Sequence, residues 1–178
     1  MSADWRTPRR RLSTGPLRGR FEVSESVIDA AERLLPTFRG ADGDHEGILF
    51  LLGVERPSAT LYLSVAAPDA EHDPGRVHVR REGVLAVARA ARRLRLGVLG
   101  QLHSHPGSWT EHSLGDDAMV LMPFDGMLSI VVPHYGHFGL RPLESLGVHQ
   151  FQDGKWVLCE RSSVHDGFHV LPTDMDLR

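Results

Sequence analysis

The sequence predicts a mixed α/β fold, an α+β sandwich in which a central mixed sheet is flanked by helices. Short apolar runs with the character of strands alternate with stretches in which apolar residues recur at helical spacing. The chain has 178 residues, of which 41% are hydrophobic and 24% charged, a composition that suits one globular domain. We therefore expect one sheet core without internal repeats.

The first helix is expected to begin near Ser26. Apolar residues recur at helical spacing from position 27 to position 38, and Ser26 with Asp29 forms a plausible capping box. Pro36 is expected to end or kink this helix. Two strands, at residues 46–54 and 60–67, should follow it as a hairpin.

Residues 81–95 fit a second helix. Its expected inward residues are Val84, Ala88, Ala91 and Leu94, while its arginines face outward, most simply into solvent or otherwise toward an acidic partner. The remaining pattern predicts, in order, a strand at 96–102, a helix at 114–122, a strand at 127–132 and a hairpin at 148–159 that turns at Asp153-Gly154.

The ends of the chain lack this patterning. Six of the first 20 residues are arginine, with little to bury, so residues 1–20 are expected to form a flexible basic arm. Residues 21–160 form the predicted domain, and residues 161–178 are expected to be a polar tail.

Composition excludes several classes of protein. A net charge of −3 gives no overall attraction to nucleic acid or to an anionic membrane, and neither is expected as a partner. The longest nearly unbroken apolar run has eight residues, at 47–54, against the ~20 of a membrane-spanning helix. No apolar stretch typical of a secretory signal follows the first residues, so a cytoplasmic location is expected. The lone Cys159 excludes an internal disulfide and is expected to be a small core residue.

The candidate metal-ligating and catalytic residues lie mainly in positions 100–117, which read GQLHSHPGSWTEHSLGDD. His103 and His105 are two apart at the end of an expected strand, so both imidazoles should point to the same face. Asp116 follows Ser113 by three residues in the first turn of the next expected helix and can supply a carboxylate. Two imidazoles and one carboxylate suit Zn²⁺ with a fourth position left open, as in catalytic zinc sites.

Neighbouring polar residues could be mistaken for ligands. Glu111, His112 and Asp117 are interpreted as supports of the ligands or as rim residues. Trp109, in the loop after the histidines, either covers a substrate channel or packs locally.

The spacing of these residues matches a known pattern. HSHP at positions 103–106, followed after six residues by Ser113 and after two more by Asp116, resembles the HSHPx₆SxxD signature of the JAB/MPN metalloproteases, the JAMM or MPN-plus enzymes. That family also places a glutamate on an earlier strand, ahead of an apolar run that ends in glycine, and Glu46 in EGILFLLG fits. The resemblance covers about residues 24–136. Within the family, the chain resembles the prokaryotic branch.

The resemblance implies a cytidine-deaminase-like MPN/JAB fold and one Zn²⁺ per chain, held by His103, His105 and Asp116. It also implies that Glu46 takes the proton of the attacking water and passes it to the leaving amine. Ser113 would direct its hydroxyl at the developing oxyanion, and it can serve as a helix N-cap at the same time.

The implied activity is that of a zinc-dependent isopeptidase or peptidase that cleaves after the C-terminal glycine of a ubiquitin-like protein, in deconjugation or in precursor processing. Expected partners are the ubiquitin-like protein or its conjugates, with ubiquitin-activating-like and conjugating-like proteins of the same system, antiphage defence included. Two alternatives stay open: a non-catalytic MPN scaffold, and a hydrolase of small amide-bonded sulfur-carrier adducts.

Overall fold

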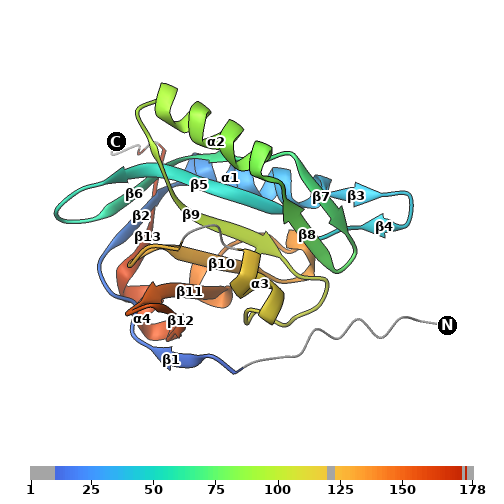
Figure 1. Cartoon of the computed structure of the whole chain (residues 1–178). Helices are drawn as coiled ribbons and strands as arrows, with labels where there is room; N and C mark the ends of the chain where they lie inside the picture. The colour runs from blue at the N-terminus through green and yellow to red at the C-terminus, as the bar shows by residue number, and fades with distance from the viewer. Residues whose placement is uncertain (1–10, 120–122, 174, 176–178) are drawn as a thin grey trace.

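The computed structural model describes residues 11–119, 123–173 and 175, and it confirms the mixed α/β class. A nine-stranded sheet contains both parallel and antiparallel pairs, in the order β1-β12-β11-β10-β9-β5-β6-β2-β13 (Figure 1). Its strands are β1 (Ser13–Gly15), β2 (Phe21–Ser24), β5 (Ile48–Glu55), β6 (Thr60–Ala66), β9 (Gly97–Ser104), β10 (Leu128–Val132), β11 (Gly147–Gln152), β12 (Lys155–Cys159) and β13 (Phe168–Leu171).

Helix α1 (Glu25–Leu34) covers one face of the sheet. It buries Val27, Ile28 and Ala31, which lie in the main hydrophobic core with strand residues. The predicted capping box of Ser26 and Asp29 is wrong. The residue that precedes the helix is Ser24, without a side-chain cap bond, and Asp29 instead accepts a hydrogen bond from Arg141. A 3₁₀ turn, Leu35–Thr37, follows directly, because proline cannot continue the α-helical hydrogen bonding.

The predicted central hairpin is confirmed as β5 and β6, which pair antiparallel. Their register shifts between Leu52 and Gly53, where a β-bulge lies. A Cβ at Gly53 would fall 1.8 Å from the carbonyl oxygen of Leu61, so only glycine fits at this close approach.

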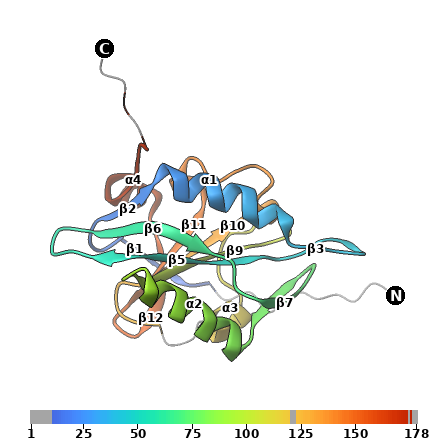
Figure 2. The same ribbon diagram turned by 90° about the horizontal axis from the view of Figure 1, so that it is seen from above.

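Helix α2 (Arg81–Arg93) lies on the opposite face of the sheet from α1, as Figure 2 shows from above. Its predicted inward face is partly wrong. Ala91 is buried and Val84 is partly buried, but Ala88 is exposed and Leu94 is 61% exposed, and the buried residues of the helix are Gly83, Val87 and Ala91. Leu94 is exposed because the helix ends at Arg93 and leaves it at the C-cap. Gly83 is buried because the helix packs closely there, where a Cβ would lie 2.6 Å from the carbonyl oxygen of Asp69.

The second half of the sheet follows the predicted order. β9 pairs parallel with β10, β10 pairs antiparallel with β11, and β11 with β12 forms the expected hairpin. Asp153 and Gly154 both have positive φ, at 52° and 79°, as a type I′ turn requires. Helix α3 (Leu114–Met119) begins where predicted, and residues 120–122 of that prediction lie outside the described residues.

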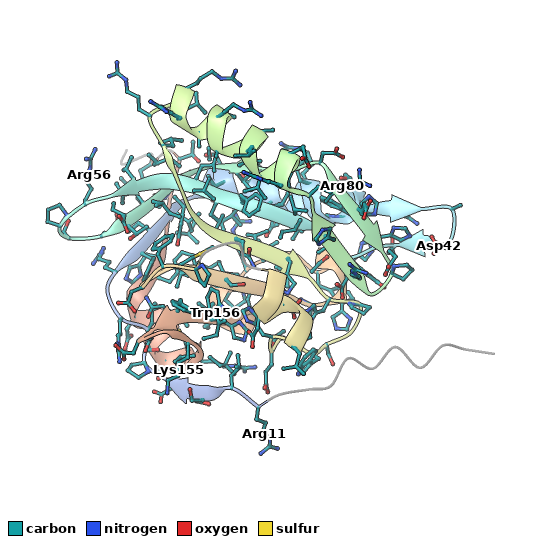
Figure 3. The ribbon with its side chains drawn as sticks, viewed as in Figure 1. Arg11, Asp42, Arg56, Arg80, Lys155 and Trp156 are labelled. Carbon is teal, nitrogen blue, oxygen red and sulfur yellow. The ribbon has the colours of Figure 1, made fainter. Side chains whose placement is uncertain are left out.

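Two small hairpins were not predicted. They are β3 (Arg39–Gly40) with β4 (Gly43–Asp44), where Asp42 is labelled at the tip in Figure 3, and β7 (Ala70–Asp73) with β8 (Arg76–Val79). Further 3₁₀ turns span His134–Gly136 and Leu143–Ser145. None of the described helices is both long and apolar enough to span a membrane.

The predicted arm and tail both contribute to the sheet, which corrects their boundaries. Ser13–Gly15, assigned from the sequence to the arm, is β1 and pairs parallel with β12. Residues of the expected tail form α4 (Arg161–Gly167) and β13, which pairs parallel with β2 at the other edge. Each strand is too short for its periodicity to be visible, and each is stabilised by a partner distant in sequence. The first ten residues of the predicted arm lie outside the described part of the chain.

Phe168 tests whether the C-terminal segment belongs to the fold. Its side chain is 4% exposed and its ring lies 6.2 Å from that of Phe21 and 6.1 Å from that of Tyr62. We expect Phe168→Ala to lower the free energy of unfolding by about 3–5 kcal/mol, measured by urea denaturation. The control is Leu171→Ala on the same strand, where the side chain is 37% exposed. Equal effects of the two variants would contradict this packing.

Candidate metal centre

The two histidines of the motif lie at the end of the central strand β9. Its neighbours are β5 on one side and β10 on the other, and its residues from Gly100 to Ser104 are buried. His103 is 2% and His105 4% exposed. The backbone N–H of His105 donates to the carbonyl oxygen of Val132 at 2.9 Å, which continues the pairing one residue past the strand. Both imidazoles are thereby held to one side of a rigid sheet.

The carboxylate of Asp116 reaches this position because α3 begins with a reciprocal cap. The backbone N–H of Asp116 donates to Ser113 Oγ at 3.1 Å, and the backbone N–H of Ser113 donates to Asp116 Oδ2. This is the arrangement of a capping box, with aspartate in place of the usual glutamate. The cap that starts the helix therefore also orients the side chain that faces the histidines.

The three side chains form a compact triangle. The Nε2 atoms of His103 and His105 are 3.2 Å apart, and they lie 3.4 and 3.3 Å from the carboxylate oxygens of Asp116. A tetrahedral zinc with bonds of about 2.0–2.1 Å has ligands about 3.3–3.4 Å apart. The donor set and its spacing therefore fit a divalent metal ion, and this buried group could hold one.

Each ring nitrogen of His105 has a defined role. Nδ1 lies 3.1 Å from the carbonyl oxygen of Trp109, to which it donates, so Nε2 is the ring nitrogen that faces the triangle and could bind a metal ion. The indole of Trp109 also stacks on the imidazole, with ring centroids 5.1 Å apart. His103 differs, because its Nδ1 is buried with no hydrogen-bond partner among the described residues.

The triangle is electrostatically coupled. Burial alone would raise the pKa of Asp116, but the charges and hydrogen bonds of His103 and His105 outweigh it and hold that pKa well below its usual range. Burial would lower the pKa of His105, but the hydrogen bond and charge of Asp116 produce a net rise. The carboxylate is therefore ionised, as a metal ligand must be.

Glu46 faces this group across the β5–β9 pair. Ile48 pairs with His103, and the backbone N–H of Ser104 donates to the carbonyl oxygen of Gly47 at 2.9 Å, so the same register brings Glu46 opposite His105. Burial raises the pKa of Glu46 to about 8, with His105 opposing and Asp116 adding to the shift. The predicted general base is thus a buried carboxyl that titrates near neutral pH.

The backbone beyond β10 is strained where it supports the loop after His105. His134 and Tyr135 both have φ of 54°, in the left-handed region that costs roughly 1–2 kcal/mol per non-glycine residue. In this conformation, the N–H of His134 donates to the carbonyl oxygen of Gly107, and the N–H of Tyr135 donates to the carbonyl oxygen of His105. Such strain persists where surrounding contacts enforce it, and it is concentrated at functional sites. The sequence offers no signal for it.

The other residues singled out from the sequence divide clearly. His112 and Asp117 bond to each other, with His112 Nδ1 3.0 Å from Asp117 Oδ1, and neither is part of the potential metal group. Glu111 is half-buried and is not part of the potential metal group. Cys159 is a core residue, as expected, and burial raises the pKa of its thiol to about 12.

Sequence reasoning missed three polar residues beneath the site. Gln101, Ser129 and His149 are each buried on strands β9, β10 and β11, and all three belong to one hydrogen-bonded cluster with His112. A single polar residue inside an apolar strand is a weak signal, and only the pairing of the strands brings these three together.

Comparisons with known proteins identify a shared fold but not a family. No family model matches the chain, and a search of curated proteins finds no match either. The solution structure of protein DSY2949 from Desulfitobacterium hafniense has a TM-score of 0.60 at 11% identity, over 87% of this chain and 94% of that one. A Salinibacter ruber protein has a TM-score of 0.55 at 19% identity, over 77% and 87%. At these identities the likeness concerns the fold alone.

Removal of one ligand tests the metal centre directly. We expect the wild-type protein to bind one equivalent of Zn²⁺, and His103→Ala to weaken that binding at least about 100-fold, because loss even of a residue that only supports a ligand costs about 10- to 100-fold. Chelator competition measures the affinity. The control is His78→Ala, an exposed histidine on β8. Equal affinity of the two variants would show that the ion binds elsewhere.

The raised pKa of Glu46 predicts a pH dependence of stability in the metal-free protein. Between its ordinary value of 4.5 and the folded value of about 8, the folded chain holds a proton that the unfolded chain has lost. Stability therefore falls as pH rises through this window, by up to about 1.4 kcal/mol per pH unit from this group.

Glu46→Gln removes this titration and leaves the other groups in place. The stability of the variant relative to wild type should therefore increase from about pH 5 to about pH 8, measured by urea unfolding with a chelator present. A difference between the two proteins that does not change with pH would contradict the assignment.

Proposed function

We propose that this chain is a zinc-dependent peptidase of the JAB/MPN type, which hydrolyses the amide bond after the C-terminal glycine of a ubiquitin-like protein. The observation that carries the proposal is the buried triangle of His103, His105 and Asp116, with Glu46 opposite it across two paired strands. This geometry belongs to the same residues whose spacing resembles the family signature.

The residues divide the chemistry among them. A zinc ion held by the triangle would supply Lewis acidity and would lower the pKa of a water molecule toward about 7. Glu46 accepts the proton of the attacking water, and the water oxygen forms a bond to the carbonyl carbon. The same carboxyl then returns the proton to the amine as the carbon–nitrogen bond breaks. A carboxyl with a pKa near neutrality is suited to both transfers.

Ser113 contributes through its hydroxyl group. Its Oγ accepts the hydrogen bond of the Asp116 N–H, which leaves the hydroxyl hydrogen to be donated to the developing oxyanion. The N-cap role and the catalytic role are compatible, because one uses the oxygen as an acceptor and the other uses the hydrogen.

The substrate class rests on the resemblance. An extended C-terminal tail of a ubiquitin-like protein can approach a sheet by strand addition, with little side-chain bulk at its glycines. The proposed setting is a prokaryotic cytoplasm, with ubiquitin-activating-like and conjugating-like proteins as further partners. There are two alternatives. The same residues could hydrolyse a small amide-bonded sulfur-carrier adduct, or the chain could be a non-catalytic scaffold that binds the metal without cleavage.

The test is cleavage of a ubiquitin-like protein fused through its C-terminal glycine to a reporter, with metal content determined on every sample. We expect the wild type to cut, and Glu46→Gln to retain zinc while its turnover falls by at least about 10²-fold, the lower range of a general acid–base contribution. Gel analysis with mass spectrometry of the products locates the scissile bond.

A matched carboxyl control is Glu71→Gln. Glu71 is exposed on β7, pairs with Arg80 and has no contact with the triangle in the described structure. This variant should cut like wild type. If both wild type and Glu46→Gln bind zinc and neither cuts any fusion, the peptidase proposal fails in favour of the scaffold or of small adducts as substrates.

A further inference from the structure

Behind the metal triangle lies a cluster of polar side chains, which we call the His112 network: Gln101, His112, Asp117, Ser129 and His149. Four of its members are nearly inaccessible to solvent, with exposures of 4% for Gln101, 1% for His112 and 0% for Ser129 and His149. Buried polar groups are costly unless every one is hydrogen-bonded. Each member of this buried network therefore needs hydrogen-bond partners.

The direction of each bond on one side of His112 is determined by the donors available. Gln101 Nε2 donates to Ser129 Oγ at 3.1 Å, so the hydroxyl hydrogen of Ser129 is free for His112 Nε2 at 2.9 Å. Nε2 of the neutral His112 ring is then the acceptor, because the carboxylate of Asp117 only accepts and so requires the ring hydrogen on Nδ1. That nitrogen donates to Asp117 Oδ1 at 3.0 Å.

The other side of His112 is equally determined. His149 Nδ1 lies 3.0 Å from the carbonyl oxygen of Gly147 and must donate to it, so His149 Nε2 accepts the backbone N–H of His112 at 3.3 Å. The two rings stack with centroids 3.9 Å apart and an interplanar angle of 19°. Trp156, labelled in Figure 3, packs its ring 5.1 Å from that of His112. Both imidazoles are thus neutral, and each carries its ring hydrogen on Nδ1.

Electrostatics agree with that assignment. Burial lowers the pKa of His112 to about 3, and burial also lowers the pKa of His149 well below its ordinary value. Two stacked, charged rings would repel each other at this distance. The network is therefore a fixed set of directional bonds at neutral pH.

The network is attached to both ends of the cap that presents Asp116. His112 immediately precedes Ser113, and Asp117 immediately follows Asp116, so the bond between His112 and Asp117 closes around the capping box. At its other end, Gln101 and Ser129 are paired residues of β9 and β10. Gln101 lies two residues before His103, on the same strand and the same face.

The close approach of the loop before α3 adds a second attachment. A Cβ at Gly147 would fall 1.7 Å from the carbonyl oxygen of Thr110, so the loop lies directly on the start of β11. His149, two residues along that strand, then meets the backbone of His112. The loop is held at its base by shape and by hydrogen bonds together.

We propose that His112 is a positioning residue of the metal centre: through Ser129 and Asp117 it sets the first turn of α3 against β9, so that Asp116 meets His103 and His105. An apolar residue in its place would fill the space without specifying where the helix starts. A displacement of a fraction of an ångström at Asp116 would spoil a triangle whose sides match a tetrahedral metal. This inference rests on the metal centre of the proposed function, but not on its substrate.

The test compares metal affinity in variants that stay folded. Ser129→Ala removes one hydroxyl without opening a large cavity, and His112→Phe keeps a stacking ring while it loses the bonds. We expect both to bind Zn²⁺ about 10- to 100-fold more weakly at 25 °C, by chelator competition, as for other residues that support metal ligands. The visible absorption spectrum of the Co²⁺-loaded protein should also change, because it reports the geometry of the ligands.

The matched control is Gln152→Leu. Gln152 is also a buried polar residue of β11, but it lies at the end of the strand away from Gly147 and bonds to Pro16 and Gln150. Its loss should lower the melting temperature of the metal-free protein without changing the affinity or the Co²⁺ spectrum. A merely structural role of His112 would give this same pattern.

The outcomes separate the inference from the proposed function. Unchanged affinity and an unchanged spectrum in folded Ser129→Ala and His112→Phe would overturn it, and Ser129→Ala alone decides if His112→Phe does not fold. A wild-type protein that binds no metal overturns both proposals. A wild-type protein that binds metal and cleaves nothing overturns the peptidase proposal, while weakened affinity in the two variants would still support the positioning role.

Discussion

The pairing of β5 with β9 is the interaction on which the rest of the site depends. Ser104 makes two hydrogen bonds to Gly47, the residue that precedes β5. Its backbone N–H donates to the carbonyl oxygen of Gly47, and its Oγ accepts a hydrogen bond from the N–H of Gly47, both at 2.9 Å. A slip of one residue in this register would turn both histidines to the other face of the sheet. Ser104 is fully buried between His103 and His105, and a slip would break the bond that its hydroxyl makes with the N–H of Gly47.

A second constraint is that one set of atoms starts a helix and completes the ligand triangle. The carboxylate of Asp116 caps the Ser113 N–H on one side and faces two imidazoles on the other. Helix initiation and site assembly are therefore the same event at this position. Because the capping residue is also the candidate ligand, α3 can be as short as Leu114–Met119 and still present it.

Much of the fold could be predicted from the sequence, and so could the residues of the site. The hairpin of β5 and β6, the turn at Asp153-Gly154 and the start of α3 carry strong local signals, and the structure shows each of them. Spacing alone brought His103, His105 and Asp116 into consideration, because period-2 strand geometry and a helix start constrain where they point.

What could not be predicted depends on contacts between distant segments. β1 and β13 are short strands that exist only because β12 and β2 lie beside them, and their residues resemble ordinary loop sequence. The inward face of α2 was misjudged because Gly83 lies on it, against the backbone of Asp69, and hydrophobicity does not record such contacts. His112 joins the polar cluster for the same reason, since its partners come from β10, β11 and α3.

The separation of Glu46 from the ligands along the chain has a consequence for the order of folding. The three ligands fall within one short segment, positions 103 to 116, whereas Glu46 lies 57 residues before His103. Closing the longer loop costs about 1 kcal/mol more in chain entropy than closing the shorter one. Local contacts form sooner than distant ones, so we expect the cap between Ser113 and Asp116 to form before β5 pairs with β9, which orients the histidines and brings Glu46 opposite them. In the proposed peptidase, hydrolysis would therefore require closure of the long-range sheet, and a partly folded chain would not cleave its substrate.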